Sequence, residues 1–354
     1  MLDPIRAAVW RREWQMERLW GWWTQHKLEI LGEYLQAFAT ATKNKSKSRI
    51  YFDLFAGVPK NRAKLTNEEI VGSAQRALTT DPPFTHVALF ELAPKAQLLR
   101  NALAQQFPRH TGVRVYDGDC NVQIDRALGD FAHVRWAPAF AFVDQHDNEI
   151  RWETLTKLAR FRRTMRRVPT KTELWILLGT SFNVRTLLRK DGRANGEYAD
   201  SLTRMFGDDS WRPIVEARRD ELISATMFRA EWVNLMRWRL ERVLGYGITY
   251  AFTMKETGGK DLYDMVFASD HQAGQKIMAH LYGKAAARHE QMRQHALRIR
   301  RDQSLQKKDG TVGLFALTTD MVVVDVPNKE LYVHDQPHEP RDLTYYRSHG
   351  DQLV

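Results

Sequence analysis

The sequence predicts an α/β protein built on a mainly parallel sheet with helices on both faces. Five short apolar runs, each of strand length, alternate with stretches of helical periodicity between residues 50 and 180. Such alternation favours parallel strands, because each crossover helix returns the chain to the same end of the sheet. Two later apolar runs flank a turn with two glycines and predict an antiparallel hairpin that closes the sheet.

Two helices are expected before the first strand. Trp10, Trp14 and Trp23 stand at helical spacing with charged residues between them, and leucines continue the pattern. We expect the two helices to meet near residues 21–24, and the basic segment 42–49 to end the second one. The tryptophans are either the face that packs against the protein body or, alternatively, a surface that stacks nucleobases.

The five apolar runs are predicted to be the parallel strands. They read "IYFDLFAG" (50–57), "HVALFEL" (86–92), "VRVYDGDC" (113–120), "AFAFVDQ" (139–145) and "ELWILLGT" (173–180). Most of them end in polar or acidic residues. Because ligands of parallel α/β sheets bind at the carboxyl ends of the strands, this edge is the expected place of a site.

The remaining elements follow in order along the chain. The hairpin is predicted from "YGITYAFTMK" and "DLYDMVFASD" around "ETGGK", and a basic helix from about residue 271 is followed by a strand-like run, "GLFALTTDMVVVDV". The expected organisation is N-terminal helices (1–45), an α/β core (46–184), a helical insertion (185–244), a hairpin and helix that complete the core (245–282), and a basic helix with a C-terminal extension (283–354).

Composition limits the class of protein. The chain has 354 residues, 43% of them hydrophobic, and one cysteine, which excludes a disulfide framework or a cysteine-built metal site and suits a reducing cytoplasm. No apolar run approaches the roughly 20 residues of a membrane span, and no signal peptide is recognisable, so we expect a cytoplasmic protein without a membrane partner. The net charge of +10 favours a polyanion such as nucleic acid, although a solvated basic surface has the same composition.

Acidic residues end successive predicted strands and suggest a nucleotide site. Asp53 precedes a glycine turn, where backbone N–H groups and a helix N-terminus favour a close, negatively charged ligand. Glu91 ends the second strand, where a carboxylate accepts ribose hydroxyls, and Asp119 ends the third, within reach of an adenine amino group or the adjacent backbone. Asp144 ends the fourth. The alternative is that these acids only cap turns.

These residues resemble the class I S-adenosylmethionine-dependent methyltransferase fold, and more closely the three-Cys-motif partner proteins (TcmP), a bacterial family. The resemblance spans about residues 23–282 and rests on "WTQHKLEILGEYLQAF", "IYFDLFAG", "VGSAQRAL", "LFEL", "GDCN", "AFAFVD" and "VFASDHQAGQKIM". It implies a Rossmann-like, class I methyltransferase-type mixed sheet with N-terminal helices and a helical insertion. It also implies S-adenosylmethionine as cofactor and a three-cysteine-motif, radical S-adenosylmethionine-like protein as partner.

The resemblance also implies roles for individual residues. The methionine end of the cofactor pocket would be shaped by Asp53, Phe55, Ala56 and Gly57. The ribose would be held by Glu91, with Leu92 following it, and the adenine would lie by Asp119 and Cys120. Asp144 would face the methyl acceptor.

The acceptor motif differs from that of many amino-methyltransferases, which have an acidic or amide residue, two prolines and an aromatic at this point. Here the segment reads "DQHD", without either proline or the aromatic. Asp144 would orient the acceptor, and His146 with Asp147 would form an acid–base pair, since histidine titrates near neutral pH. Alternatively, His146 is a polar surface residue.

Basic residues follow both the cofactor turn and the acceptor motif. Pro59 replaces a second glycine of the family pattern and could open the next helix, while Lys60, Arg62 and Lys64 either contact substrate phosphates or are solvated. The segment 157–171 has no acid and is expected near the acceptor site, where it would guide a nucleic-acid backbone. Its candidate contacts are Arg160, Arg162, Arg163, Arg166 and Arg167.

The sequence therefore favours an S-adenosylmethionine-dependent methyltransferase that acts on DNA, RNA or a nucleic-acid-linked substrate. Two alternatives remain open. One is a non-catalytic partner of this fold that binds nucleic acid and a second protein. The other is an enzyme of the same fold that uses a different adenosine-containing ligand. Base specificity cannot be read from the basic segments, because phosphate contacts position a nucleic acid without specifying its sequence.

Overall fold

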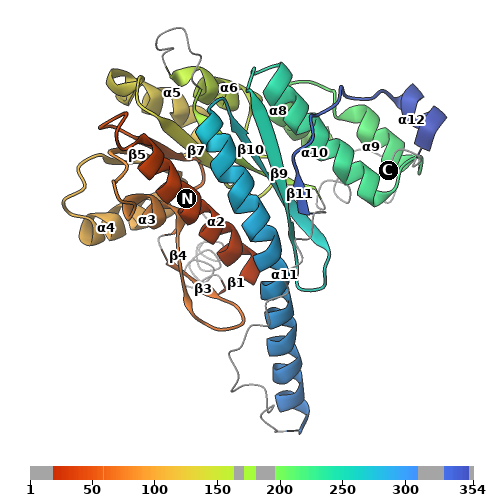
Figure 1. The fold of residues 1–354 in the computed structure, drawn as a ribbon, viewed down its shortest axis with the longest axis horizontal. Helices are drawn as coiled ribbons and strands as arrows, with labels where there is room; N and C mark the ends of the chain where they lie inside the picture. Colours follow the sequence, from red (N-terminus) through yellow and green to blue (C-terminus); the bar gives the residue numbers. More distant parts are fainter. Residues whose placement is uncertain (1–18, 59, 163–170, 181–195, 310–330, 351–354) are drawn as a thin grey trace, which may run out of the picture.

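The computed structural model describes residues 19–58, 60–162, 171–180, 196–309 and 331–350. Its centre is an eight-stranded sheet with the strand order β11-β9-β10-β8-β7-β2-β5-β6 (Figure 1). The strands are β2 (Ile50–Asp53), β5 (His86–Glu91), β6 (Val113–Asp117), β7 (Ala139–Val143), β8 (Glu173–Gly179), β9 (Ile248–Lys255), β10 (Asp261–Ser269) and β11 (Tyr332–Val333). All five predicted parallel strands and both strands of the predicted hairpin are confirmed.

The order and direction of the strands confirm the fold class. β6, β5, β2, β7 and β8 are parallel neighbours, and the chain reverses its direction of travel across the sheet after β6. β10 then pairs antiparallel with both β8 and β9, so the hairpin inserts its second strand next to the parallel part. This is the Rossmann-like, class I methyltransferase-type mixed sheet that the sequence predicts.

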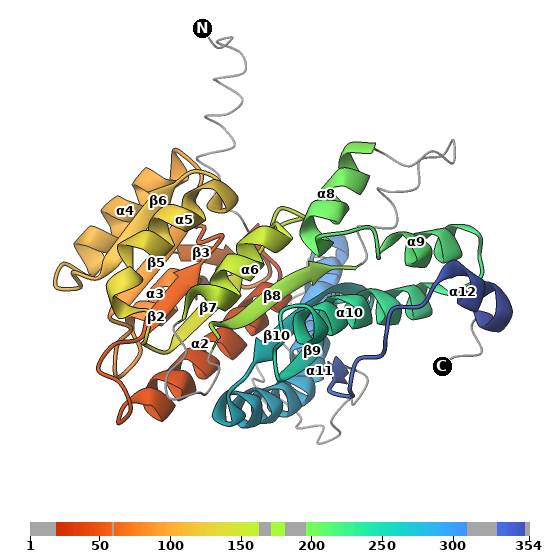
Figure 2. The same cartoon turned by 90° about the horizontal axis from the view of Figure 1, so that it is seen from above.

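Helices cover both faces of the sheet, as Figure 2 shows. On one face α2 (Trp22–Thr42) and α11 (Gln272–Asp309) pack side by side, with α3 (Ser73–Leu78) and α4 (Lys95–Gln106) beside them. The other face carries α5 (Cys120–Asp130), η1 (Ala132–Val134), α6 (Trp152–Phe161), α8 (Gly196–Phe206), α9 (Arg212–Arg219), α10 (Ala225–Arg242) and α12 (Leu343–His349). The first predicted N-terminal helix, with Trp10 and Trp14, lies outside the described residues.

Each central strand is buried on both faces, which explains its continuous apolar sequence. In β2 the side chains of Ile50 and Phe52 enter the core under α5 and α6, while Tyr51 enters the core under α2. β8 alternates in the same way, with Trp175 and Leu177 on the α2 side. Successive strand residues point to opposite faces, so a strand between two helical layers needs apolar residues throughout.

The segment after the glycine turn differs from the prediction. Instead of a helix that starts at Pro59, the chain forms β3 (Lys60–Ala63) and β4 (Glu69–Val71), and the next helix, α3, begins only at Ser73. β1 (Leu19–Trp20) joins them in a separate three-stranded sheet. The physical reason is visible in the burial, since Ala63 and Ile70 are buried while the residues on either side of each are exposed or only partly buried, a strand pattern rather than a helical one. Pro59 itself lies outside the described residues.

In the described part of the chain between β8 and β9, the helices α8, α9 and α10 pack against the sheet. α10 is anchored by an ion pair between Arg229 and Asp264 of β10, and the hydroxyl of Tyr198 in α8 donates to Asp147 in the loop after β7. The strand-like run 313–326 lies outside the described residues. None of the helices that the structure describes is long and apolar enough to cross a membrane.

Candidate active site at the carboxyl ends of the strands

The parallel strands bring the predicted site acids to one edge of the sheet. Asp53 lies opposite Leu89 of β5 and Phe142 of β7 in the strand register. Glu91 and Asp144 each follow these positions by two residues, so both extend beyond the end of β2 on either side of its turn. The carboxyl ends of parallel strands meet at the same edge, where ligands of such sheets bind.

The turn after β2 is fixed by hydrogen bonds to β5. The N–H of Ala56 donates to the carbonyl of Phe90 at 2.9 Å, and the N–H of Gly57 donates to Oε2 of Glu91 at 2.7 Å. Gly57 has a φ of +64°, a conformation that other L-residues adopt only at a cost. The turn and the proposed ribose-binding carboxylate are therefore held together as one unit.

The surroundings of this unit fit an adenosine-containing ligand. A Cβ placed on Gly57 would meet no atom within 4 Å, so the space in front of the turn is open. Glu91 Oε1 accepts the N–H of Leu92 at 3.0 Å, and each carboxylate oxygen keeps a second lone pair for a ribose hydroxyl. The side chain of Leu92 is 59% exposed and that of Val122, at the start of α5, is 65% exposed. These two apolar side chains, of which Val122 was not predicted, are available to contact a base.

Asp119 and Cys120 have structural tasks at the start of α5. Asp119 is the N-cap, and its Oδ1 accepts the backbone N–H and the side-chain amide of Asn121, both at 2.8 Å. Asn121 in turn donates to the carbonyl of Glu149 and so joins this turn to the loop after β7. Cys120 is buried, and burial raises the pKa of its thiol to about 12, so the thiol is not reactive at neutral pH.

Asp144, which the sequence analysis expects to face the methyl acceptor, is paired with a residue that was not among the predicted site residues. Lys27 Nζ of α2 lies 2.5 Å from Oδ1 of Asp144, with the two side chains 4% and 22% exposed. Lys27 occupies a position of the buried stripe of α2, between Thr24 and Leu31. A lysine on the buried face of a helix is the signal that would have identified it, because a lysine is almost never fully buried unless it is paired.

Two further polar groups near Lys27 and Asp144 are buried, the carboxylate of Asp53 and the hydroxyl of Tyr263. Asp53 Oδ2 accepts the hydroxyl of Tyr51 at 3.0 Å, while Oδ1 accepts no hydrogen bond within the described part of the chain. The pKa of Asp53 is raised to about 7, chiefly by burial and to a smaller extent by the nearby carboxylate of Asp144, while the hydroxyls of Ser73 and Tyr51 offset part of the effect. The hydroxyl of Tyr263 is also without a partner among the described residues, and its ring centroid lies 5.3 Å from Lys27 Nζ.

The proposed acid–base pair of the "DQHD" segment is not assembled in this structure. Asp147 Oδ1 accepts the hydroxyl of Tyr198 at 3.0 Å, and His146 is exposed with its backbone N–H bonded to Glu149. No hydrogen bond or ion pair between His146 and Asp147 is present in the described structure. Gln145 is buried and holds the loop by bonds to the carbonyl of Leu177 and the N–H of Ile150.

Arg160, Arg162 and Lys171, which are described residues of the basic segment, lie at the amino edge of the sheet and not beside Asp144. α6 starts near the carboxyl edge and runs back, because β7 and β8 are parallel. Arg162 donates to the carbonyls of Trp136 and Lys171, which precede β7 and β8, and burial lowers its pKa. Arg160 is exposed at this edge. Arg163, Arg166 and Arg167 lie outside the described residues.

Other basic residues of these segments are also placed. Lys157 pairs with Glu153 and Asp125, and Lys171 pairs with Asp270. Arg62 is exposed on β3, and Lys60 lies on the same strand with a side chain outside the described part. Among the described residues of the segment 157–171, Lys157, Arg162 and Lys171 are therefore already bonded to other groups of the protein.

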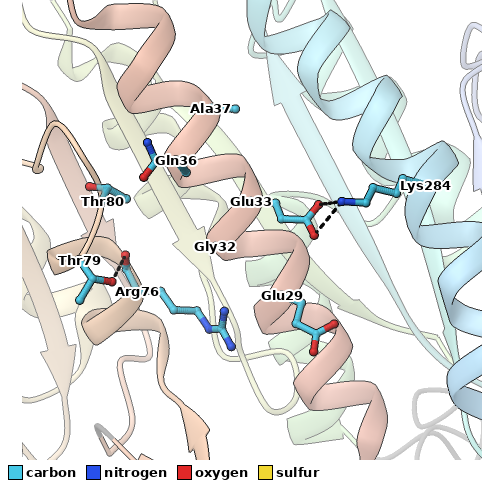
Figure 3. A pocket seen from close by; sticks show the side chains of 9 residues that line it. All are labelled: Glu29, Gly32, Glu33, Gln36, Ala37, Arg76, Thr79, Thr80 and Lys284. Carbon is cyan, nitrogen blue, oxygen red and sulfur yellow. Dashed lines mark hydrogen bonds and ion pairs between the residues drawn. The ribbon is translucent and has the colours of Figure 1, made fainter. Parts of the chain in front are cut away.

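A groove of about 630 Å³ lies elsewhere, between α2, α3 and α11 (Figure 3). Its charged residues pair with one another or with neighbours. The carboxylate of Glu33 forms an ion pair with Lys284 at 3.1 Å, as Figure 3 shows, and a second one with Arg288 at 2.6 Å. None of the predicted site residues lines this groove, so the carboxyl edge remains the candidate site. The described residues contain no cluster of three or more histidine, cysteine, aspartate or glutamate side chains suited to a metal ion.

Comparisons with known proteins add little to this picture. No family model matches the chain, and no curated protein matches it. A candidate O-methyltransferase from Klebsiella pneumoniae aligns at a TM-score of 0.35 with 13% identity, over 68% of this chain and 80% of that chain. A Legionella pneumophila str. Philadelphia 1 protein of family DUF519 aligns at 0.35 with 10% identity, over 71% and 88%. At these values neither carries an inference, and the TcmP resemblance remains a prediction.

Proposed function

We propose that this protein binds S-adenosylmethionine at the carboxyl edge of its sheet and transfers a methyl group. The observation that supports this most is the Gly57–Glu91 hydrogen bond, which fixes the turn after β2 and the carboxylate after β5 in one open unit. Glu91 would hold the ribose, Leu92 and Val122 would flank the adenine, and Asp119, Cys120, Phe55 and Ala56 would complete the walls through the turns they form. When bound, the cofactor would supply the methyl group.

The other residues needed for catalysis would be those that position the methyl acceptor. Asp144 lies at the end of β7, partly exposed, and its Oδ2 is available to accept a hydrogen bond from the acceptor group. Most of the rate gain would come from holding the acceptor in line, since proximity and orientation can lower a barrier by about 7–11 kcal/mol. His146 and Asp147, which flank this position, would take part only after a rearrangement that frees Asp147 from Tyr198.

Calorimetry with S-adenosylmethionine tests the cofactor proposal. We expect micromolar binding by the full chain and a loss of roughly 10- to 100-fold in Glu91→Ala, because a charged acceptor of two hydroxyls is removed. Asp117→Ala is the matched control, since Asp117 is an exposed carboxylate at the end of neighbouring β6. ATP serves as the competing adenosine ligand. Absence of S-adenosylmethionine binding at millimolar concentration, with the fold intact, would reject the proposal.

We further propose a nucleic-acid acceptor, which the net charge of +10 supports. α11 extends beyond the sheet (Figure 1), and its distal part carries exposed Arg298, Arg300 and Arg301. Gln303 of this part donates to the carbonyl of Leu65 in the β3–β4 turn, which brings the arginines near the strand of Arg62. Phosphates bound there would make affinity depend on salt.

Salt titrations of single-stranded DNA and RNA binding test this surface. Replacing Arg298, Arg300 and Arg301 with alanine should flatten the slope of log affinity against log salt by about one for each lost phosphate contact. Arg212→Ala with Arg219→Ala is the control, because both arginines pair with neighbouring aspartates in or beside α9. An unchanged slope in the triple variant would remove this surface from the proposal.

A non-catalytic role is the second candidate, and the Lys27–Asp144 ion pair favours it, because Asp144 Oδ1 is already engaged. In that role the protein would bind nucleic acid and a three-cysteine-motif protein without transferring a methyl group. Incubation with methyl-labelled S-adenosylmethionine and nucleic acid, with and without such a partner, separates the two. Label transfer that disappears in Asp144→Ala supports the enzyme, and cofactor binding without transfer in either mixture supports the binding protein.

A further inference from the structure

The amino edge of the sheet, where the parallel strands begin, gathers basic side chains from several elements. Lys45 lies in the loop before β2, Arg160 is at the end of α6, and Arg135 lies between η1 and β7. All three are exposed. Segments that are far apart in sequence therefore place positive charge on the same edge, across the sheet from the candidate active site.

Contacts and electrostatic effects show that these basic residues lie close together. Burial lowers the pKa of His271, which follows β10, and the charges of Lys45 and Arg162 lower it further. Arg162 in turn donates to the carbonyl of Trp136, three residues before β7. The loop before β2, the end of α6 and the segment before β7 therefore form one continuous surface.

A group of histidines extends this surface toward β5 and β6. The ring of His86, the first residue of β5, lies 5.4 Å from the ring of His133 in η1. The pKa of His86 is lowered by burial and then by His133, Arg114 and His110, so all of these side chains are near it. The ring of Phe131 packs against both His86 and Arg114.

Acidic residues beside these groups are already engaged. Asp130 pairs with Arg114 at 2.8 Å, and Asp270 pairs with Lys171 at 2.9 Å. Within the described residues, the side chains of Lys45 and Arg160 form no ion pair or hydrogen bond. Like charges that are held near one another repel, and an anion bound among them would be attracted by all of them.

The same edge exposes an aromatic ring beside the cations. The side chain of Trp136 is 41% exposed, and its main chain is held by the bond from Arg162. Proteins that bind single-stranded nucleic acids combine a basic groove for the phosphates with aromatic rings on which unpaired bases stack. A duplex offers phosphates to such a surface, but its bases remain stacked on one another.

We propose that the amino edge binds a single-stranded nucleic acid, with phosphates on Lys45 and Arg160 and one base stacked on Trp136. This goes beyond the proposed function, because binding here requires neither the cofactor site nor the distal arginines of α11. That helix begins next to the amino edge, and Arg300 lies about 40 Å further along its axis, at 1.5 Å per residue. The two basic surfaces are therefore separate.

The test measures binding of a labelled oligothymidylate to the full chain by fluorescence anisotropy over a range of salt concentrations. Lys45→Ala combined with Arg160→Ala should flatten the slope of log affinity against log salt by about 0.7 for each lost phosphate contact. Arg212→Ala with Arg219→Ala is the matched control, because it removes the same charge from arginines that pair with aspartates, and it should leave the slope unchanged.

Replacement of Trp136 tests the stacking contact. Trp136→Ala should weaken oligothymidylate binding by roughly 5- to 100-fold, while Trp136→Tyr keeps most of the affinity and duplex binding stays within about twofold. Thermal unfolding of each variant checks that the fold is retained. Calorimetry with S-adenosylmethionine should give the same affinity in all of these variants, because the changes are on the other edge of the sheet.

The outcomes separate this inference from the proposed function. An unchanged salt slope in the double variant together with unchanged affinity in Trp136→Ala would overturn it, as would an effect confined to the variant of Arg298, Arg300 and Arg301. Binding of phosphatidylserine vesicles but not of oligothymidylate would also overturn it, in favour of a lipid surface. If the wild type binds no S-adenosylmethionine but the amino-edge variants still weaken oligothymidylate binding, the cofactor proposal falls and this inference stands.

Discussion

The ion pairs Lys27–Asp144 and Arg229–Asp264 both cross from a helix to the carboxyl edge of the sheet, yet they differ in how fully the carboxylate is bonded. The side chain of Asp264 is 1% exposed. Its carboxylate accepts hydrogen bonds from Arg229 Nε at 3.1 Å and from Arg229 Nη2 at 2.6 Å. It also accepts the hydroxyls of Thr253 at 2.8 Å and Thr180 at 3.2 Å. Asp144 accepts one bond from Lys27 within the described residues and is 22% exposed.

A carboxylate offers about four acceptor sites, and Asp264 uses four of them. Such an arrangement has no capacity left for a ligand, and its task is to anchor α10 to β10. Asp144 keeps most of its capacity and lies near Asp53 Oδ1 and the Tyr263 hydroxyl, which have no hydrogen-bond partner among the described residues. The comparison shows that burial and charge alone do not distinguish an anchor from a binding group, whereas the number of unused donors and acceptors does.

The largest effect is expected from breaking the anchor. Arg229→Met leaves Asp264 buried without its cation and should lower the free energy of unfolding by about 3–5 kcal/mol at neutral pH. Burial already raises the pKa of Asp264 with Arg229 present. At lower pH the Asp264 carboxylate should therefore become protonated in the variant, and the loss in free energy of unfolding should be smaller. Urea unfolding at pH 7 and pH 5 measures both. Asp264→Asn in the Arg229→Met background should restore part of the loss, and a deficit below about 1 kcal/mol would contradict the anchor role.

A smaller, pH-dependent effect is expected at Asp53. Its pKa is raised to about 7 in the folded protein, so between about pH 4 and pH 7 the folded state binds more protons than the unfolded state. Stability from this group is therefore present at low pH and is lost as pH rises through that window. Asp53→Asn removes the titration. Its stability relative to the wild type should rise by a few kcal/mol, on the order of 1.4 for each unit of pKa difference, between pH 4 and pH 8.

Denaturant unfolding across this pH range provides the measurement, and Glu173→Gln provides the comparison. Glu173 is an equally buried carboxyl at the amino edge, but Tyr34 at 2.5 Å and Ser269 at 2.6 Å donate to its two oxygens. Replacement there should disturb a satisfied network and destabilise the protein at all pH values. Parallel wild-type and Asp53→Asn curves would show that the raised pKa of Asp53 is not expressed in the folded protein.

The fold was readable from the sequence because its strands are buried on both faces. Runs such as 86–92 and 139–145 are apolar throughout, are of strand length and are separated by helical segments, and each became a parallel strand. The β3–β4 hairpin was missed because a few buried side chains, such as Ala63 and Ile70, are a weak pattern inside a polar segment. Local periodicity detects elements that pack on a large core and misses those that do not.

The candidate site was only partly predictable from the sequence, because it is formed by contacts between residues that are distant in sequence. The strand-end positions of Asp53, Glu91 and Asp144 follow from the parallel topology alone. The pairing of Asp144 with Lys27 joins residues 117 positions apart, and Tyr263 reaches the same place from the hairpin. The position of Arg160 and Arg162 at the amino edge was not predictable from the charge run, because the direction of the crossover helix decides which edge its charges reach.

The smallest effect is expected from the Lys27–Asp144 pair, measured as a double-mutant cycle with Lys27→Met, Asp144→Asn and the double variant. Because Asp144 is partly exposed and bonded once, solvent can replace Lys27, and the coupling should be about 1 kcal/mol, well below that of Arg229 with Asp264. A coupling of 3 kcal/mol or more would make Lys27 a second anchor and remove the distinction between the two pairs.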